Sequence, residues 1–442
     1  MEVSLLNLKK NPIVYGTILL SFSGLICRGI GFFYRLFLSQ NFGEEAMGIF
    51  QLTSPILMLA FSLTCAGTQT AISKYTASCM GLKNESLAQK FLLTGCVLSL
   101  SLSLLYSILI FCQAENISIY ILQEKRCAPL LRICAFSFPF SALHSCFNGY
   151  FYGKKETRIP SFTQITEQLV RVGSVYFLYH YFLQQNKLPS IALTCVGMVL
   201  GESVSFFISI VYYLTLCPTN TKKTSQDSAI SVLGQLLTLS LPLTFNRVFV
   251  NLLQSYEAVS LPASLREYGY SPESSLSLYG VLTGMALSLV FFPSTFVHSV
   301  SVLLLPSVSE ASSVQNNRQI KHTIQKSIFF SFSLGFVCTL FFFLFGNFCG
   351  TFLFASPLAG TFIRQLSFLC PFLYLHITLA SILNGLKKTK TTLFINIFSL
   401  LLRLFFIISF VPILGIKGYL WGLLLSELLS SLFCVAALKK YF

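Results

Sequence analysis

Two arginines lie in one otherwise apolar stretch near the start of the sequence, GLICRGIGFFYRLFL at 24–38. Arg28 and Arg35 are seven residues apart, about two helical turns, so a helix places both on one face. An arginine inside a bilayer is costly and usually faces a bundle interior or a watery cavity. The forked guanidinium matches the geometry of a phosphate. The spacing therefore predicts a cationic stripe that can bind an anion.

A second polar stripe consists of Arg247, Asn251 and Gln254, spaced i, i+4 and i+7 on one helical face. Together with Arg28 and Arg35, this stripe favours a cationic cavity for an anionic substrate. The alternative is structural, because backbone carbonyl groups or buried glutamates can also satisfy such arginines. The sequence leaves both interpretations open.

Other arginines lie near carboxylates in predicted membrane spans. Arg171 and Glu202, like Arg403 and Glu427, lie near the middle of consecutive apolar segments. Each half of the chain is therefore expected to hold one structural ion pair between helices, Arg171–Glu202 and Arg403–Glu427. Glu167 lies one helical turn before Arg171 and can share that guanidinium, so Arg171 and Glu167 are also candidate substrate-binding residues.

Signatures of enzymes and metal centres are absent from the sequence. It contains no P-loop, no GxGxxG and no HExxH motif. The 14 cysteines are scattered through apolar segments, which is typical of small helix-packing residues rather than metal ligands. We therefore expect no catalytic residue, no metal and no cofactor. An ion or proton gradient is left as the open energy source.

The elements that must position these residues are membrane-spanning helices. The composition is 54% hydrophobic and 10% charged, with a mean hydropathy of +0.73, which excludes a soluble domain. Long apolar runs predict an all-α polytopic membrane protein with about twelve spans. These spans are 12–38, 47–73, 91–113, 129–152, 160–183, 190–216, 229–256, 278–305, 327–347, 361–386, 391–413 and 416–438.

The basic residues between these spans predict the orientation of the chain. If the N-terminus is cytoplasmic, most loop lysines and arginines fall on the cytoplasmic side, as the positive-inside rule requires. This pattern predicts a multi-pass protein of the bacterial cytoplasmic membrane with both termini inside. The net charge of +15 then reflects topology, and no nucleic acid partner is expected.

Two halves of the chain resemble each other weakly. Residues 153–171 and 385–403 align without gaps, and each segment starts with glycine and ends with arginine. GMVLGE at 197–202 corresponds to GLLLSE at 422–427. Such repeats predict two six-helix bundles, 1–217 and 229–442, joined by a cytoplasmic linker at 218–228. The arginine stripes are expected to face the cleft between the bundles.

Several motifs resemble a known family. GLICRGIGFFYRLFL with MGIFQLTSP, GYFYGKKETRIPSFTQITEQLVRV, and LPASLREYGYSPESSLSLYGVLTGMALSLVFFPSTF are the most specific. They are similar to segments of stage V sporulation protein B-like proteins. These belong to the multidrug, oligosaccharidyl-lipid and polysaccharide exporter (MOP) superfamily, which includes the lipid II flippases. The resemblance covers nearly the whole chain and implies a MATE-like transporter fold.

The resemblance also implies a function. Such a flippase moves polyprenyl-pyrophosphate-linked oligosaccharide or peptidoglycan precursors across the membrane by alternating access, as a monomer among membrane lipids. The cleft arginines of the family correspond to Arg28 and Arg35, and less firmly to Arg171. Many relatives have fourteen helices, and in lipid II flippases the two additional helices are associated with a groove for the lipid tail. With twelve spans, the resemblance does not indicate where the lipid tail would lie. The alternative is a cation-coupled multidrug exporter of the same superfamily, which the arginines beside the deep carboxylates disfavour.

Overall fold

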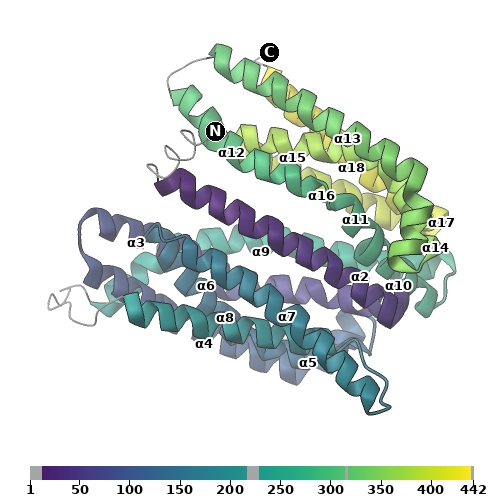
Figure 1. Cartoon of the computed structure of the whole chain (residues 1–442), viewed down its shortest axis with the longest axis horizontal. Helices are drawn as coiled ribbons and strands as arrows, with labels where there is room; N and C mark the ends of the chain where they lie inside the picture. Colours follow the sequence, from purple (N-terminus) through teal and green to yellow (C-terminus); the bar gives the residue numbers. More distant parts are fainter. Residues whose placement is uncertain (1–11, 217–227, 314–316, 440–442) are drawn as a thin grey trace. The chain divides into compact units, whose positions relative to one another are not determined.

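The protein is helical throughout the part that the computed structural model describes, which comprises residues 12–216, 228–313 and 317–439. Figure 1 traces these helices from the N-terminal to the C-terminal end. Apart from residue 228, the predicted linker at 218–228 lies outside the described residues. The prediction of an all-α membrane protein is confirmed.

The first eleven helical segments of the described residues extend to α10, which follows the helix that carries the second polar stripe. They are α2 (Pro12–Phe61), η1 (Ser62–Ala66), α3 (Gly67–Gly81), α4 (Glu85–Asn116), η2 (Ile117–Ile121), α5 (Cys127–Ala135), α6 (Ser137–Gly153), α7 (Arg158–Gln184), α8 (Leu193–Leu216), α9 (Ala229–Tyr268) and α10 (Pro272–Gly280). Where α4 begins, the side chain of Asn84 caps the helix by accepting a hydrogen bond from the backbone N–H of Leu87.

The remaining segments follow the same helical pattern. They are η3 (Val281–Ala286), α11 (Leu287–Phe291), α12 (Ser294–Ser313), α13 (Asn317–Phe354), α14 (Pro357–Leu366), η4 (Ser367–Leu369), α15 (Cys370–Gly385), α16 (Thr389–Ser409), α17 (Val411–Leu414) and α18 (Ile416–Leu438). The segments η1, η2 and η3 are π-helical, and η4 is a 3₁₀ turn. Ser356 caps α14, and Pro357 occupies its first turn.

Length and composition identify nine helical segments in the described residues that can cross a membrane, or ten with the bent pair α5–α6. One of the nine, Ile18–Gly81, has 64 residues and is far too long for a single crossing of about 20 residues. It is interrupted at Gly43, whose φ of 83° and ψ of 179° are not helical. If Ile18–Gly81 is counted as two crossings, and the bent pair α5–α6 and the charged helix α7 are included, the segments correspond to the twelve predicted spans.

The described helices form two compact units, which we describe separately. Unit 1 contains 1–31 and 52–255, and unit 2 contains 32–51 and 256–442. The helices α2 and α9 therefore each contribute to both units, a division that the bundle boundaries predicted from the repeat did not anticipate. The core of unit 1 packs around Phe91, Tyr150 and Phe151, and the core of unit 2 around Ile324 and Leu383.

Two of the three π-helices among the described residues, η1 and η3, lie at the same distance in sequence from an arginine stripe. The segment η1 begins 34 residues after Arg28 (28 to 62), and η3 begins 34 residues after Arg247 (247 to 281). A π-turn is rare, and it is usually retained where the local backbone has a role. Its recurrence at one spacing supports the duplication that the sequence predicts.

Candidate functional site

The first part of α2 packs against α7 within unit 1 through small side chains. Cys27 Sγ donates to the backbone oxygen of Gln164 at 3.5 Å, and the hydroxyl of Ser23 lies 3.4 Å from the Gln164 side chain. One turn further on, a Cβ added at Gly31 would lie 3.3 Å from the Gln168 amide nitrogen. Ser23, Cys27 and Gly31 are spaced i, i+4 and i+8, so this stripe is the face of α2 that meets α7.

Arg28 and Arg35 both have exposed side chains on α2. Among the described residues, neither guanidinium has a hydrogen bond or an ion-pair partner. Guanidinium groups carry five N–H donors each and cannot be deprotonated in proteins. On an apolar membrane helix, two such unpaired groups require water or an anion. That they face a central cleft stays a prediction.

Arg247, Asn251 and Gln254 follow one face of α9, as their spacing predicts. Arg247 Nη1 donates to the backbone oxygen of Ala66 at 3.3 Å. Asn251 Nδ2 donates to the backbone oxygen of Met58 at 3.2 Å and also bonds the Ser62 hydroxyl. Gln254 is exposed. Part of this stripe therefore has the structural role that the sequence left as an alternative.

The π-helix η1 explains why these carbonyl groups are available. A π-turn shifts the backbone hydrogen-bond register by one residue, so oxygens at its ends are less completely used by the helix. Met58 precedes η1 by one turn, and Ala66 is its last residue. The stripe on α9 therefore supplies side-chain donors at the place where α2 and η1 depart from regular α-helix.

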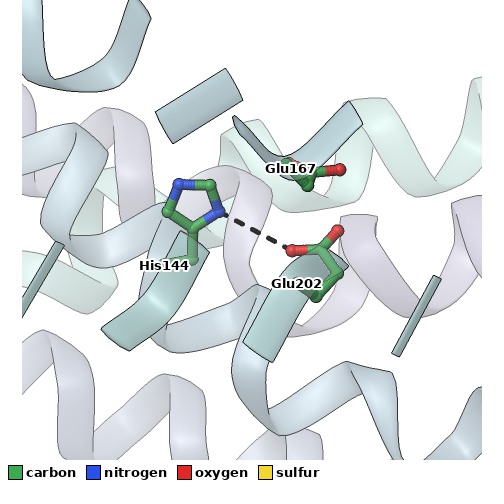
Figure 2. Close-up of side chains that lie close together, drawn as sticks. All are labelled: His144, Glu167 and Glu202. Atoms are coloured by element: carbon green, nitrogen blue, oxygen red, sulfur yellow. Dashed lines mark ion pairs between the residues drawn. The ribbon is translucent and has the colours of Figure 1, made fainter. Parts of the chain in front are cut away.

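Unit 1 also holds a buried charged cluster formed by α6, α7 and α8. Arg171 Nη2 contacts Glu167 Oε1 directly and lies 4.0 Å from Glu202 Oε1. His144 Nδ1 lies 3.6 Å from the other oxygen of Glu202. Figure 2 shows His144, Glu167 and Glu202 converging, with a dashed line for the His144–Glu202 pair. Both predicted partners of Arg171 are thus beside it, with Glu167 closer.

His144 is a member of this cluster that the sequence analysis missed. Its Nε2 lies 3.1 Å from the Asn148 amide and 3.3 Å from the Thr163 hydroxyl, so both ring nitrogens have neighbours. The internal repeat contains a pattern that could have identified His144. His144 precedes Arg171 by 27 residues (144 to 171), and His376 precedes Arg403 by the same number (376 to 403).

The corresponding cluster of unit 2 corrects one predicted ion pair. Arg403 Nε lies 3.4 Å from Glu257 Oε1, and the Tyr419 hydroxyl donates to the same oxygen at 2.9 Å. Glu427 instead pairs with His376, whose Nδ1 lies 2.9 Å from Glu427 Oε2. Within the described residues, the predicted Arg403–Glu427 pair is therefore not formed. The prediction ended the span at residue 256, whereas α9 continues to Tyr268 and carries Glu257 into the core.

The cluster in unit 1 has a donor set that metals use. One ligand atom each from His144, Glu167 and Glu202 lies within 4.8 Å of the others. Arg171, however, already contacts Glu167 and lies beside Glu202, so its guanidinium supplies the positive charge. A divalent cation would have to compete with this fixed charge, and the donor set alone does not define a metal site.

A pocket of about 260 Å³ lies beside this cluster within unit 1. Its lining combines polar side chains, including that of Glu202, with apolar side chains. The pocket is lined by Leu57, Met58, Phe61, Thr64, Ser137, Phe138, Ser141, Met198, Glu202 and Asn251. The carboxylate of the charged cluster and the amide of the α9 stripe therefore meet at one cavity.

Solved structures identify the fold class. An inward-facing multidrug resistance MATE family transporter of the MOP superfamily covers 96% of this chain with a TM-score of 0.72 at 14% identity, and 99% of that chain is matched. A MOP superfamily transporter from Pyrococcus furiosus matches 98% of this chain and 96% of its own, with a TM-score of 0.66 and 15% identity. The protein is therefore a multi-pass membrane protein with a MATE-like fold.

The family follows from sequence comparison. Residues 13–312 match the family model described as polysaccharide biosynthesis protein, and residues 270–408 match the MatE model. The chain belongs to the polysaccharide biosynthesis protein family. Stage V sporulation protein B of Bacillus subtilis is 26% identical over 98% of this chain and 84% of its own length. Lipid II flippase MurJ of the same organism is 19% identical over 72% of this chain and 62% of its own length.

Proposed function

We propose that this transporter moves polyprenyl-pyrophosphate-linked saccharides, of the kind used for peptidoglycan or polysaccharide synthesis, across the cytoplasmic membrane by alternating access. Arg28 and Arg35 bind the pyrophosphate of the lipid carrier. The observation that carries this proposal is that both guanidinium groups lack a partner among the described residues on a membrane helix. The family and its flippase relative support the same substrate class.

The contrast with the other membrane arginines strengthens the argument. Arg171 and Arg403 are held by Glu167 and Glu257, so their charge is already compensated. Arg28 and Arg35 rise about 10 Å along one helix face, and their long side chains allow both to reach one dianionic group. A ligand that is itself cationic would meet two unpaired positive charges here. The multidrug exporter alternative is therefore the weaker one.

The proposal includes a topology and an assembly state. Both termini are cytoplasmic, the two bundles extend over 1–217 and 229–442, and the monomer is the working unit. The loop charges support the orientation of the termini, and the internal repeat of the sequence supports the two bundles. An ion or proton gradient supplies the energy.

Complementation tests the proposed function. A strain depleted of its lipid II flippase would express the wild type, Arg28→Lys or Arg28→Ala, and accumulated lipid-linked precursor would be measured together with protein abundance. Arg28→Ala should lower precursor export about tenfold or more at normal abundance, because charge-assisted hydrogen bonds contribute about 1.5–3 kcal/mol each. Arg28→Lys should retain weak export, because lysine keeps the charge but loses the bidentate fork.

The control is Arg318→Ala, which removes an exposed arginine at the start of α13 and should leave export unchanged. Full export by an Arg28→Ala, Arg35→Ala double variant would contradict the proposal. Failure of the wild type to restore precursor export, together with rescue of a drug-efflux defect, would favour the multidrug exporter.

A further inference from the structure

The pocket of unit 1 presents hydrogen-bonding groups that the proposed pyrophosphate site does not use. Its volume of about 260 Å³ lies below the ~300–1,000 Å³ that is usual for drug-sized ligands, so it has room for roughly one ring. It is formed by α2, η1, α6, α8 and α9. Every lining residue belongs to unit 1, the same unit as Arg28.

Glu202 is the most informative lining residue. It is 8% exposed, and its carboxylate oxygens lie 3.6 Å from His144 Nδ1 and 4.0 Å from Arg171 Nη2. Both distances exceed the range of a hydrogen bond to nitrogen. Within the described residues, the acceptor sites of Glu202 therefore stay unused. Such a carboxylate can accept hydrogen bonds from the hydroxyl groups of a neutral ligand.

The other polar side chains of the pocket also have hydrogen-bonding capacity left. Asn251 uses its amide nitrogen for Met58 and Ser62, and its oxygen has no partner among the described residues. Ser141 has no hydrogen bond within the described chain. Ser137 donates to the backbone oxygen of Cys134 at 2.7 Å, and its oxygen is still able to accept.

The remaining lining of the pocket is apolar and partly aromatic. Phe61 and Phe138 contribute rings, and Leu57, Met58 and Met198 complete the surface. A sugar ring has the matching character, because its C–H faces are apolar while its rim carries hydroxyl groups. Specific sites commonly combine apolar walls with a few convergent polar groups in this way.

We infer that this pocket binds one monosaccharide unit of the lipid-linked saccharide, with Glu202, Asn251 and Ser141 as hydrogen-bonding groups and Phe138 against the ring. This inference rests on the proposed function, since it assigns the saccharide of the same substrate. Helix α7 connects the two places, because Gln164 contacts α2 beside Arg28 while Arg171 reaches Glu202. The pyrophosphate on the arginines of α2 and the saccharide in this pocket then use different groups of the protein.

Two probes separate the two proposals. The first is a short-chain polyprenyl pyrophosphate, and the second is the same lipid carrying one N-acetylglucosamine. Affinities of both for the purified full chain in detergent would be compared for the wild type and for Arg28→Ala, Glu202→Gln and Ser141→Leu. Ser101→Leu is the matched control, because Ser101 is exposed on α4 and donates to Leu98 of its own helix at 2.9 Å.

The sugar should raise affinity in the wild type by about fivefold or more, since one net hydrogen bond is worth about 1 kcal/mol. Ser141→Leu and Glu202→Gln should abolish this gain without weakening binding of the sugar-free probe, while Arg28→Ala should weaken both probes. Ser141→Leu fills the pocket without touching the ion pairs, so it separates ligand binding from folding defects.

Three results would overturn the saccharide inference without contradicting the proposed function. The sugar could add no affinity, Ser141→Leu could affect both probes equally, or tetraethylammonium could bind in a Glu202-dependent manner where the sugar does not. If neither probe binds the wild type, the proposed function is contradicted, and the saccharide inference that rests on it is contradicted as well. If Arg28→Ala leaves both affinities unchanged, the pyrophosphate assignment fails alone.

Discussion

The arginines of the two polar stripes and the two charged clusters have three different environments. Arg171 and Arg403 contact carboxylates, Arg247 donates to a backbone oxygen, and Arg28 and Arg35 have no partner in the described chain. A buried ion pair stabilises little on balance, but removing one of its members leaves an uncompensated charge. Substitution should therefore affect stability at Arg403 and transport at Arg28.

Arg403→Ala should lower the free energy of unfolding in detergent by about 3–5 kcal/mol, because Glu257 is left charged in the core. Glu257→Gln should have a similar effect, and the Arg403→Met, Glu257→Leu double variant should recover most of the loss. Chemical unfolding monitored by far-UV circular dichroism measures these differences. In double-mutant cycles, Arg403 should couple more strongly to Glu257 than to Glu427, and the opposite order would contradict the assigned pair.

These residues also show what sequence could and could not predict. Arg171 and Glu167 are one turn apart on a single helix, so their contact follows from helical geometry. The partner of Arg403 lies on α9, far away in the chain, and helix periodicity carries no information about such a contact. The sequence predicts Glu427, in the middle of the next span, as the partner of Arg403. In the structure, Glu427 pairs with His376 instead.

At the scale of elements, close helix packing in unit 2 depends on glycine. A Cβ at Gly48 would lie 2.2 Å from the backbone oxygen of Leu276, and a Cβ at Gly280 would lie 2.4 Å from the backbone oxygen of Glu44. Backbone atoms cannot move aside as the end of a flexible side chain can. Near this contact, Glu44 also accepts hydrogen bonds from the Ser277 and Ser356 hydroxyls. The segment after Gly43 is therefore fixed to α10 and α14.

Gly48→Ala should lower the thermal unfolding temperature of the purified protein, because overpacking of this kind costs about 1–3 kcal/mol. Gly24→Ala is the matched control on the same helix, since no atom lies within 4 Å of the added Cβ. The control should be neutral or stabilising by up to ~1 kcal/mol, because alanine favours helix over glycine. Equal destabilisation by both substitutions would argue against the close approach of the backbones.

The elements themselves were largely predictable, because long apolar runs leave helices as the only structure that satisfies the backbone in lipid. The interruption at Gly43 was located between the first two predicted spans. The π-turns were not predicted, since no residue pattern in SLTCA or VLTGMA distinguishes them from α-helix. They became visible only in the backbone hydrogen bonds of the structure.

For the whole molecule, the orientation in the membrane stays a prediction from loop charge. It makes α7 an outgoing span, although α7 is not among the helices whose length and hydropathy identify them as candidate membrane spans. The buried cluster explains how α7 can cross, because Glu167 and Arg171 neutralise each other. A helix with paired charges costs the bilayer less than one with isolated charges.

Cysteine-accessibility labelling tests this orientation in a cysteine-free background. A cysteine at Glu156, before α7, should react only from the cytoplasmic side, and cysteines at Lys187 and Glu273 should react only from outside. The predicted cytoplasmic segment 222–228, most of which is outside the described residues, should react like position 156. Labelling of positions 156 and 187 from the same side would contradict a membrane-spanning α7.

The break of α2 at Gly43 has a consequence for how the chain enters the membrane during synthesis. The segment before the break carries Arg28 and Arg35, each of which costs about 2.5–3.5 kcal/mol on the insertion scale when central. The segment after it, from Gly48 through α3, is apolar for most of its length and carries no arginine. Insertion of the first segment is therefore most favourable when the second emerges with it as a helical hairpin. The charges proposed to hold the pyrophosphate thus make biogenesis of the first span dependent on its successor.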